Sequence, residues 1–282
     1  MIFKRIILFF LPVFLCGCAV ISPLVTRDAP ADNLAQNNGF KKEFIKTSRF
    51  QLTSYYRFTA PGDPVTIYIE GDGLAWLSRT RLSDDPTPRS PLILELATID
   101  PSTNVAYLAR PGQYTQSGIP DCSPEYWSTK RFSEEVVASM NEAVSEILNK
   151  AGAKKIDLIG YSGGAAIAVL IAARRDDVKS LRTIAGNLNP PELNRYHGVS
   201  QSGFSLNPFG SAKKIKNIPQ RHFVGSKDKI VPLSIIEYFV TEEGDKDFER
   251  ITVVKGAAHK DGWREHWKKL LLMPTIASPK EL

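Results

Sequence analysis

Residues 160–164 read Gly-Tyr-Ser-Gly-Gly and match the pattern G-x-S-x-G, in which a serine stands between glycines. A largely apolar run at residues 156–159 precedes the pattern, and an alanine-rich run at residues 165–170 follows it. A strand, a sharp turn and a helix in this order expose the central side chain, and glycines are needed because larger residues would collide with the turn. The sequence therefore predicts that Ser162 is a nucleophile.

A serine hydroxyl is a weak nucleophile until a base takes its proton, and that base is normally a histidine. Of the four histidines, His259 follows an apolar strand-like run at residues 251–254 and falls in a loop. His266 lies in a predicted helix, His222 begins a predicted strand, and His197 falls in a polar segment. We therefore predict His259 as the base, and a hydrogen-bonded structural role is the alternative for each histidine.

An aspartate or glutamate must orient the base, and it should follow a strand that precedes the base in the chain. Asp228 comes just after the predicted strand at residues 221–225. No carboxylate follows the preceding predicted strand, at residues 181–185, within the next four positions. Asp228 is thus the predicted acid, and the alternative is a loop aspartate paired with Lys227 or Lys229.

Negative charge develops on the substrate oxygen during attack, so two backbone N–H groups should face that oxygen. Gly163 can supply one, and the loop Glu70-Gly71-Asp72-Gly73 after an early strand can supply the other. We predict Asp72 as the second donor, with Gly73 as the alternative. Because a carboxylate in this position would repel the oxyanion, we expect the side chains of Glu70 and Asp72 to face away. A tight turn that requires glycine could coexist with this role.

Strand-like and helix-like segments alternate along residues 49–282, which favours parallel crossover units around one α/β sheet. The predicted strands are residues 50–60, 65–70, 104–108, 156–160, 181–185, 221–225 and 251–254. The predicted helices are residues 90–98, 133–152, 164–174 and 263–272, with another after Pro232. Residues 187–217 are rich in Asn, Pro, Gly and Ser, and we predict that they form a small irregular cover segment.

The strand order, the serine turn, the acid loop and the late histidine together resemble the α/β-hydrolase family from about residue 50 to residue 272. The resemblance implies an eight-stranded, mostly parallel central sheet flanked by helices and an acyl-serine mechanism. It carries the roles of nucleophile, acid and base onto Ser162, Asp228 and His259. The chain departs from the family in one place: many members have histidine before glycine in the oxyanion loop, where this chain has Glu70 before Gly71.

The N-terminus has the layout of an export signal at residues 1–17, with Lys4 and Arg5 before a largely apolar run at residues 6–15. Residues 15–18, Leu-Cys-Gly-Cys, resemble the lipobox of bacterial lipoproteins, which implies that Cys18 is acylated. A plain secretory signal is one alternative. An uncleaved anchor is another, although a membrane-spanning helix needs about 20 apolar residues.

Residues 18–48 are mixed and polar, and we predict a lipid-anchored flexible tether there. The protein is then expected in the bacterial cell envelope, lipid-anchored and extracytoplasmic. Ala19 resembles the sorting residue for the outer membrane, on its periplasmic side, if the host has two membranes. Cys16 leaves with the signal and Cys122 has no remaining partner, so no disulfide framework is expected.

The 282 residues are 43% hydrophobic, 10% aromatic and 23% charged, which excludes whole-chain disorder, collagen and coiled coil. The net charge of +6 comes from 36 basic and 30 acidic residues that are interleaved, and this excludes a dense cationic surface for nucleic acid. No set of His and Cys has metal-ligand spacing, so we expect neither a metal nor a cofactor.

These patterns predict a serine hydrolase that cleaves a carboxylic ester or a related acyl bond of a small substrate. Peptidase, thioesterase and acyltransferase activity on the same fold are alternatives, because pocket shape and water access decide between them. A non-catalytic envelope-binding lipoprotein is a further alternative. Since residues 187–217 offer no wide apolar helical face, we expect dissolved substrates and no activation at lipid interfaces.

Overall fold

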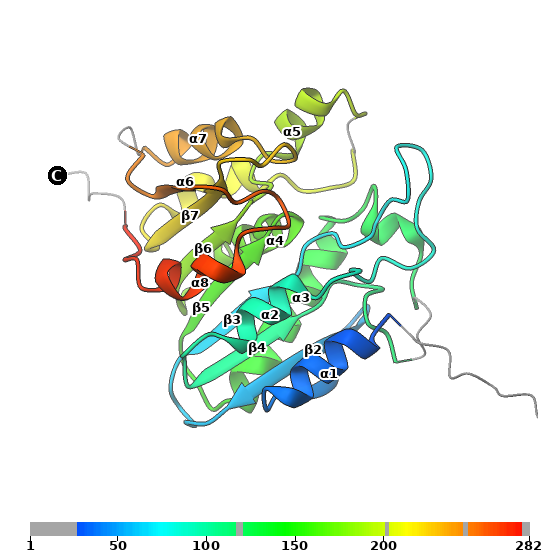
Figure 1. Cartoon of the computed structure of the whole chain (residues 1–282), viewed down its shortest axis with the longest axis vertical. Coiled ribbons are helices and arrows are strands. Elements are labelled where there is room, and N and C mark those ends of the chain that lie inside the picture. The colour runs from blue at the N-terminus through cyan, green and yellow to red at the C-terminus, as the bar shows by residue number, and fades with distance from the viewer. Residues whose placement is uncertain (1–26, 117–120, 201–202, 245–247, 278–282) are drawn as a thin grey trace, which may run out of the picture.

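The computed structural model describes residues 27–116, 121–200, 203–244 and 248–277, and one eight-stranded sheet runs through them. The strands are β1 (Lys41–Lys46), β2 (Gln51–Phe58), β3 (Val65–Ile69), β4 (Asn104–Leu108), β5 (Ile156–Tyr161), β6 (Val178–Ile184), β7 (Gln220–Gly225) and β8 (Ile251–Val254). Their order is β1-β2-β4-β3-β5-β6-β7-β8 (Figure 1). The β1–β2 and β2–β4 pairs are antiparallel and the others are parallel, which confirms the predicted mostly parallel sheet.

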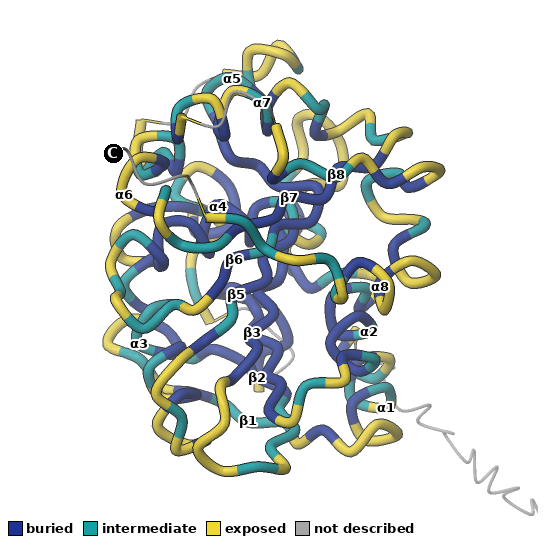
Figure 2. The backbone as a smooth tube through the Cα atoms, turned by 90° about the vertical axis from the view of Figure 1, so that its left-hand side faces the viewer, coloured by how far each residue is buried: buried dark blue, intermediate teal, exposed yellow. Residues whose placement is uncertain are grey.

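Helices cover both faces of the sheet. They are α1 (Ala29–Asn37), α2 (Leu92–Thr98), α3 (Glu134–Lys150), α4 (Gly163–Ala172), α5 (Pro190–His197), α6 (Ala212–Ile215), α7 (Leu233–Glu242) and α8 (Arg264–Leu271), with short 3₁₀ helices η1 (Pro124–Trp127) and η2 (Pro208–Ser211). Figure 2 shows α3, α4 and α6 on one side of the strands and α1, α2 and α8 on the other. Each side has its own hydrophobic core, and the α3 side also takes in buried residues of α7.

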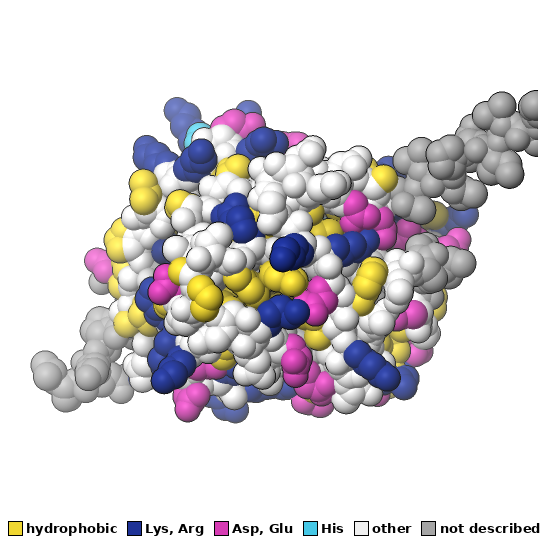
Figure 3. All heavy atoms as spheres, turned by 90° about the horizontal axis from the view of Figure 1, so that it is seen from below, with side chains coloured by type: hydrophobic (Ala, Val, Ile, Leu, Met, Phe, Trp, Pro, Cys, Tyr) yellow, Lys and Arg dark blue, Asp and Glu magenta, His cyan; other side chains and the backbone are white. Residues whose placement is uncertain are grey.

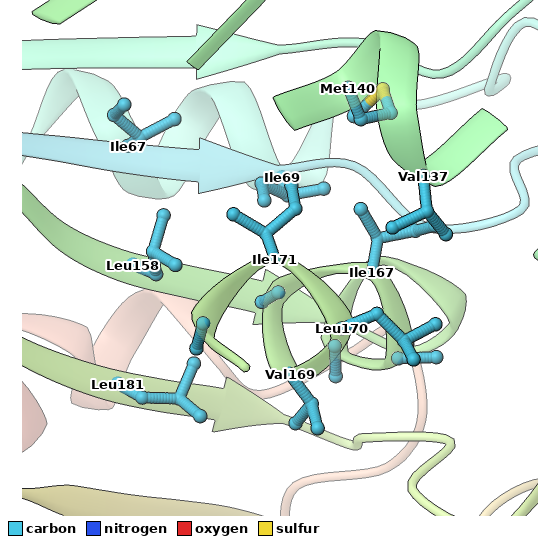
Figure 4. Packing of buried hydrophobic residues seen from close by; sticks show 14 of the residues in the cluster. Ile67, Ile69, Val137, Met140, Leu158, Ile167, Val169, Leu170, Ile171 and Leu181 are labelled. Atoms are coloured by element: carbon cyan, nitrogen blue, oxygen red, sulfur yellow. The ribbon is translucent and has the colours of Figure 1, made fainter. Parts of the chain in front are cut away.

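Strands β3 and β4 are mainly apolar, as expected where both faces of a sheet are covered. Every residue of β3 and of β4 is buried. Helix α4 is also buried throughout, and Figure 4 shows its Ile171 against Ile69 of β3 and its Ile167 against Val137 of α3. The turn between β5 and α4 therefore joins a largely buried strand to a helix that is buried throughout.

The first described elements correct the predicted flexible tether at residues 18–48. Helix α1 buries Ala31 and Ala35, and β1 pairs along its full length with β2 at the edge of the sheet. The prediction failed because this segment has few apolar residues: β1 buries only Ile45 and is otherwise exposed or partly exposed. The predicted signal at residues 1–17 lies outside the described residues. The same holds for residues 18–26, which include Cys18.

Residues 187–217 are more ordered than the irregular cover that we predicted. They contain α5, η2 and α6 among the positions that the structure describes. Asn189 caps α5 by accepting a hydrogen bond from the N–H of Glu192, two prolines occupy the first turn, and Gly198 ends the helix in a left-handed conformation. The turn residues that indicated irregular structure are thus the start and stop signals of one short helix.

Charge on the surface is mixed. On the face drawn in Figure 3, Lys and Arg side chains are interspersed with Asp and Glu, as the interleaved sequence predicts. Within the described ranges, no helix combines the length and the apolar character that crossing a bilayer requires.

Candidate active site

Ser162 lies in the turn between β5 and α4, with the backbone angles φ +50° and ψ −118°. This φ is unfavourable for any residue with a side chain, and such strain is typical of functional turns. The flanking glycines are required by space. A Cβ on Gly160 would lie 2.5 Å from the Cα of Ala165, and one on Gly164 would lie 2.4 Å from the carbonyl oxygen of Glu70. The chain therefore forms a sharp nucleophile turn at this point.

The structure brings together the three side chains that the sequence selected. The distance from Nε2 of His259 to Oγ of Ser162 is 3.1 Å, and that from Nδ1 of His259 to Oδ2 of Asp228 is 2.9 Å. The other oxygen of the buried Asp228 carboxylate accepts the N–H groups of Ile230 at 2.7 Å and Val231 at 3.0 Å. This is the geometry of a nucleophile, a base and an orienting acid.

The carboxylate of Asp228 stays ionised in this setting. Burial by itself raises its pKa, but the hydrogen bond and charge of His259 and the two backbone N–H groups outweigh burial and lower the pKa below its ordinary value. An ionised Asp228 accepts the Nδ1–H of His259, which leaves Nε2 free to take the proton of Ser162.

Hydrogen bonds to its backbone hold the loop that carries His259 in place. The backbone carbonyl oxygen of His259 accepts hydrogen bonds from the hydroxyl of Tyr161 and from Nε1 of the buried Trp263, each at 3.0 Å. The N–H of Lys227 in the acid loop donates to the carbonyl of Ala257 at 2.8 Å, so the two loops are joined. Base and acid are thus fixed relative to each other by backbone contacts.

Backbone N–H groups of Gly163 and of the loop after β3 identify a candidate oxyanion hole. Gly163 is the first residue of α4, where the helix leaves its N–H unused. The N–H of Gly71 is taken by the carboxylate of Glu70 at 2.8 Å. The N–H groups of Asp72 and Gly73 have no hydrogen-bond partner among the described residues, so both predicted second donors are available.

Gln113 decides which way the Asp72 N–H points. Its buried side chain donates from Nε2 to the carbonyl of Gly71 at 3.1 Å and accepts the N–H of Arg110 at 3.0 Å. The Gly71 carbonyl and the Asp72 N–H belong to one planar trans peptide and point in opposite directions. Gln113 therefore fixes the Asp72 N–H on the side away from itself. None of the sequence patterns assigned this role to Gln113.

We expect Gln113→Glu to lower kcat by about 10², with little change in KM, because a misplaced oxyanion donor weakens only the transition state. Glu keeps the shape and still accepts from Arg110, but an ionised carboxylate cannot donate to Gly71. Steady-state kinetics on a soluble ester measure the effect. Gln116→Glu, on the same loop, is the matched control, and an unchanged kcat in Gln113→Glu would show that the loop is held by other contacts.

The side chain of Asp72 corrects our expectation that both carboxylates face away. A Cβ on Gly163 would lie 2.1 Å from Oδ1 of Asp72, so this carboxylate lies directly against the nucleophile turn. Two guanidinium groups offset its charge: Nη1 of Arg110 and Nε of Arg131 each lie 3.4 Å from it. Glu70 is buried, and its oxygens bond the N–H of Gly71 and the hydroxyl of Tyr107. Burial raises the pKa of Glu70 to about 7.

A pocket of about 350 Å³ opens beside Ser162. Tyr161, Leu74 and Leu92 contribute to its walls, and the exposed residues Arg89 and Lys260 contribute to its rim. None of its lining residues comes from residues 187–217, so the prediction that this segment covers the site is wrong. That segment instead packs against α4 and the loop before α3. In this contact the backbone N–H of Leu206 donates a hydrogen bond to the carbonyl of Phe132 at 2.9 Å. The chain from β3 to α2 takes its place at the pocket.

Cys122, the cysteine that the sequence leaves without a partner, is not among the residues that line this pocket. Cys122 is a partly buried free thiol whose pKa is raised to about 12 by burial, which does not favour a thiolate nucleophile. Within the described part of the chain, no three His, Cys, Asp or Glu side chains are grouped as metal ligands would be.

Solved structures of similar fold include several hydrolases. An α/β serine hydrolase homologue from Coxiella burnetii has 15% identity and a TM-score of 0.52, over 82% of this chain and 93% of its own. The esterase Est1E from Butyrivibrio proteoclasticus has 16% identity and a TM-score of 0.55, over 82% and 97%. Acylaminoacyl peptidase from Pyrococcus horikoshii has 15% identity and a TM-score of 0.58, over 86% of this chain but only 43% of its own. At these identities the likeness establishes the fold alone.

Sequence comparison is more specific. No curated protein sequence matches the chain. The model of the serine hydrolase family FSH1 matches residues 93–256, which is more than half of the 282 residues and includes Ser162 and Asp228. With its eight-stranded α/β-hydrolase fold and its Ser162–His259–Asp228 contacts, the chain belongs to the FSH1 family of serine hydrolases.

Proposed function

We propose that this serine hydrolase cleaves a carboxylic ester, or a closely related acyl bond, of a small substrate. The observation that carries the proposal is the pocket of about 350 Å³ that opens directly beside Ser162 and its hydrogen-bonded His259. This volume is at the lower end of the range for small-molecule sites, which favours a short acyl group.

The reaction follows from the contacts around Ser162. Its Oγ attacks the substrate carbonyl while its proton passes to Nε2 of His259, and the N–H groups of Gly163 and Asp72 stabilise the oxyanion. His259 then gives the proton to the leaving alcohol, and an acyl-serine forms. Water attacks this ester with His259 again as the base, which releases the acid and restores the Ser162 hydroxyl.

The test is a substrate panel assayed with purified protein. It should contain soluble esters of increasing acyl length, the matching thioesters and aminoacyl amides. We expect the highest kcat/KM for short esters and a fall with chain length, because longer acyl groups exceed the pocket. Faster turnover of thioesters or amides would support the alternative activities. A steep rise when a long-chain ester passes its aggregation threshold would identify a lipase instead.

We further propose that the enzyme is an extracytoplasmic lipoprotein of the bacterial cell envelope, held at a membrane by lipid on Cys18. The Leu-Cys-Gly-Cys run at residues 15–18 supports this proposal. Mass analysis of the protein from its host should find a mature N-terminus at an acylated Cys18, and Cys18→Ser should leave the precursor uncleaved or mislocalised. Cys16→Ser is the matched control, with a mild effect. An unmodified N-terminus elsewhere would exclude the lipid anchor.

A further inference from the structure

Residues 74–86 form a hairpin loop that leaves the wall of the pocket and returns to it. Backbone pairs close it along its length: Leu74 with Pro86, Ala75 with Ser83, Trp76 with Leu82, and Leu77 with Arg81. Its first residue, Leu74, lines the pocket beside Ser162. The hairpin loop is thus an ordered projection attached to the entrance of the active site.

The tip of the hairpin loop is both apolar and basic. Trp76 is 45% exposed and Leu77 is 39% exposed, whereas the other three tryptophans of the chain are buried. Arg79 and Arg81, on the same tip, are exposed. Exposed tryptophan and leucine lose contact with water when they enter the boundary between headgroups and acyl chains, and arginines there attract anionic lipid.

The base of the hairpin loop has the opposite charge and lies where the described chain begins. Asp84 and Asp85 follow the basic tip. The carboxylate of Asp85 pairs with Arg27 at 3.3 Å, and the backbone carbonyl of Asp85 accepts a hydrogen bond from Nη1 of Arg27 at 2.9 Å. Cys18 lies nine positions before Arg27, a reach of about 30 Å at most when the chain is fully extended. If the proposed lipid anchor is present, it therefore keeps this side of the protein next to the membrane.

From these observations we propose that the tip of the hairpin loop is a second membrane contact, in which Trp76 and Leu77 enter the surface of an anionic phospholipid bilayer. Arg79 and Arg81 bind the lipid headgroups, while Asp84 and Asp85 remain at the base, away from them. Because Leu74 continues into the pocket wall, this contact fixes the entrance of the active site close to the lipid surface. The exposed tip does not depend on the anchor and can bind lipid in its absence.

Tryptophan fluorescence tests the contact directly, because Trp76 is the exposed tryptophan. The full chain is reconstituted into vesicles of phosphatidylcholine with bromine-labelled acyl chains, with or without phosphatidylglycerol. We expect quenching and a blue shift in the phosphatidylglycerol vesicles, and their loss in Trp76→Phe. Equal quenching in the wild type and in Trp76→Phe, or no quenching in either vesicle, would overturn the proposal.

Charge variants test the role of the arginines. Replacing Arg79 and Arg81 together by Gln should weaken docking by about 30-fold in phosphatidylglycerol vesicles. The matched control is Lys268→Gln with Lys269→Gln, two exposed cations on α8, which should leave the quenching unchanged. Equal weakening by both pairs would show a general charge effect and contradict a contact at this tip.

Two further measurements separate this proposal from the proposed function. Hydrolysis of a short soluble ester should be unchanged in Trp76→Phe, so a failure of the ester assay leaves the lipid contact standing. Quenching in the Cys18→Ser chain should persist in phosphatidylglycerol vesicles, because the tip binds lipid itself. Loss of Trp76 quenching in Cys18→Ser would show that the anchor alone holds the protein and would contradict the second contact.

Discussion

Ser162→Ala is expected to lower kcat for ester hydrolysis by about 10⁶-fold, the size of this loss in a serine protease. The change should also abolish labelling by a fluorophosphonate, since both reactions need the Oγ that lies 3.1 Å from Nε2 of His259. The fold should persist because the side chain packs into no core. Kinetics, probe labelling and thermal unfolding of the purified variant measure the three effects.

Ser90→Ala is the matched control, since Ser90 lines the same pocket but makes no hydrogen bond with the ring of His259 among the described residues. It should retain labelling and most of the activity. Full hydrolysis by Ser162→Ala, or loss of labelling only in Ser90→Ala, would show that the nucleophile has been misassigned.

Asp228→Asn is expected to lower kcat by about 10⁴-fold, as the same change does in a serine protease. The backbone N–H groups of Ile230 and Val231 hold one oxygen of this side chain. An asparagine that keeps these bonds must turn its NH₂ group towards Nδ1 of His259. The ring then carries its proton on Nε2, which cannot accept the proton of Ser162.

Asp261→Asn is the control for this change because Asp261 is an exposed aspartate that lines the same pocket. It should keep a near-normal kcat. Comparing kcat of the two variants across pH distinguishes two effects. One is the loss of the acceptor that orients His259, and the other is the loss of a negative charge in the pocket. A near-normal rate in Asp228→Asn would mean that another group orients His259.

The part of the site that follows strand ends could be predicted from the sequence because each of its residues is marked locally. A glycine-flanked serine between a strand and a helix is compatible with only a few turn conformations, so Ser162 could be recognised from its immediate neighbours. Asp228 and His259 each follow a short apolar strand, and parallel strands place their carboxyl ends at one edge of the sheet. The sheet was predictable for the same reason, since buried parallel strands are continuous apolar runs.

The parts that could not be predicted depend on contacts between distant segments. Edge strand β1 buries a single residue, so its sequence resembles a loop, and it becomes a strand because β2 offers a free edge. The side chain of Asp72 lies beside Gly163 because Arg110 and Arg131, 38 and 59 positions later, neutralise it. The sequence around Asp72 does not indicate that either arginine will lie beside it.

Gln113 belongs to the same group. Its role arises from the neighbouring positions of β3 and β4 in the sheet, which bring the loops after them together. In the sequence β4 is the next strand after β3, but the sequence does not show that the two strands are paired. Residues that position a backbone donor therefore become visible only with the strand order.

The buried carboxyl of Glu70 couples the stability of the fold to the proton concentration. Its pKa is about 7 in the folded protein against an ordinary value of 4.5, so between these two pH values the folded chain binds more protons than the unfolded chain. The free energy of unfolding therefore decreases as the pH rises from about 4.5 to about 7, by on the order of 3 kcal/mol from this one residue, and the decrease is complete above pH 7. Glu70 at the start of the oxyanion loop thus favours the folded chain in mildly acidic surroundings, whereas the buried His222, whose pKa is lowered by burial to about 3, has the opposite effect over much of the same pH range.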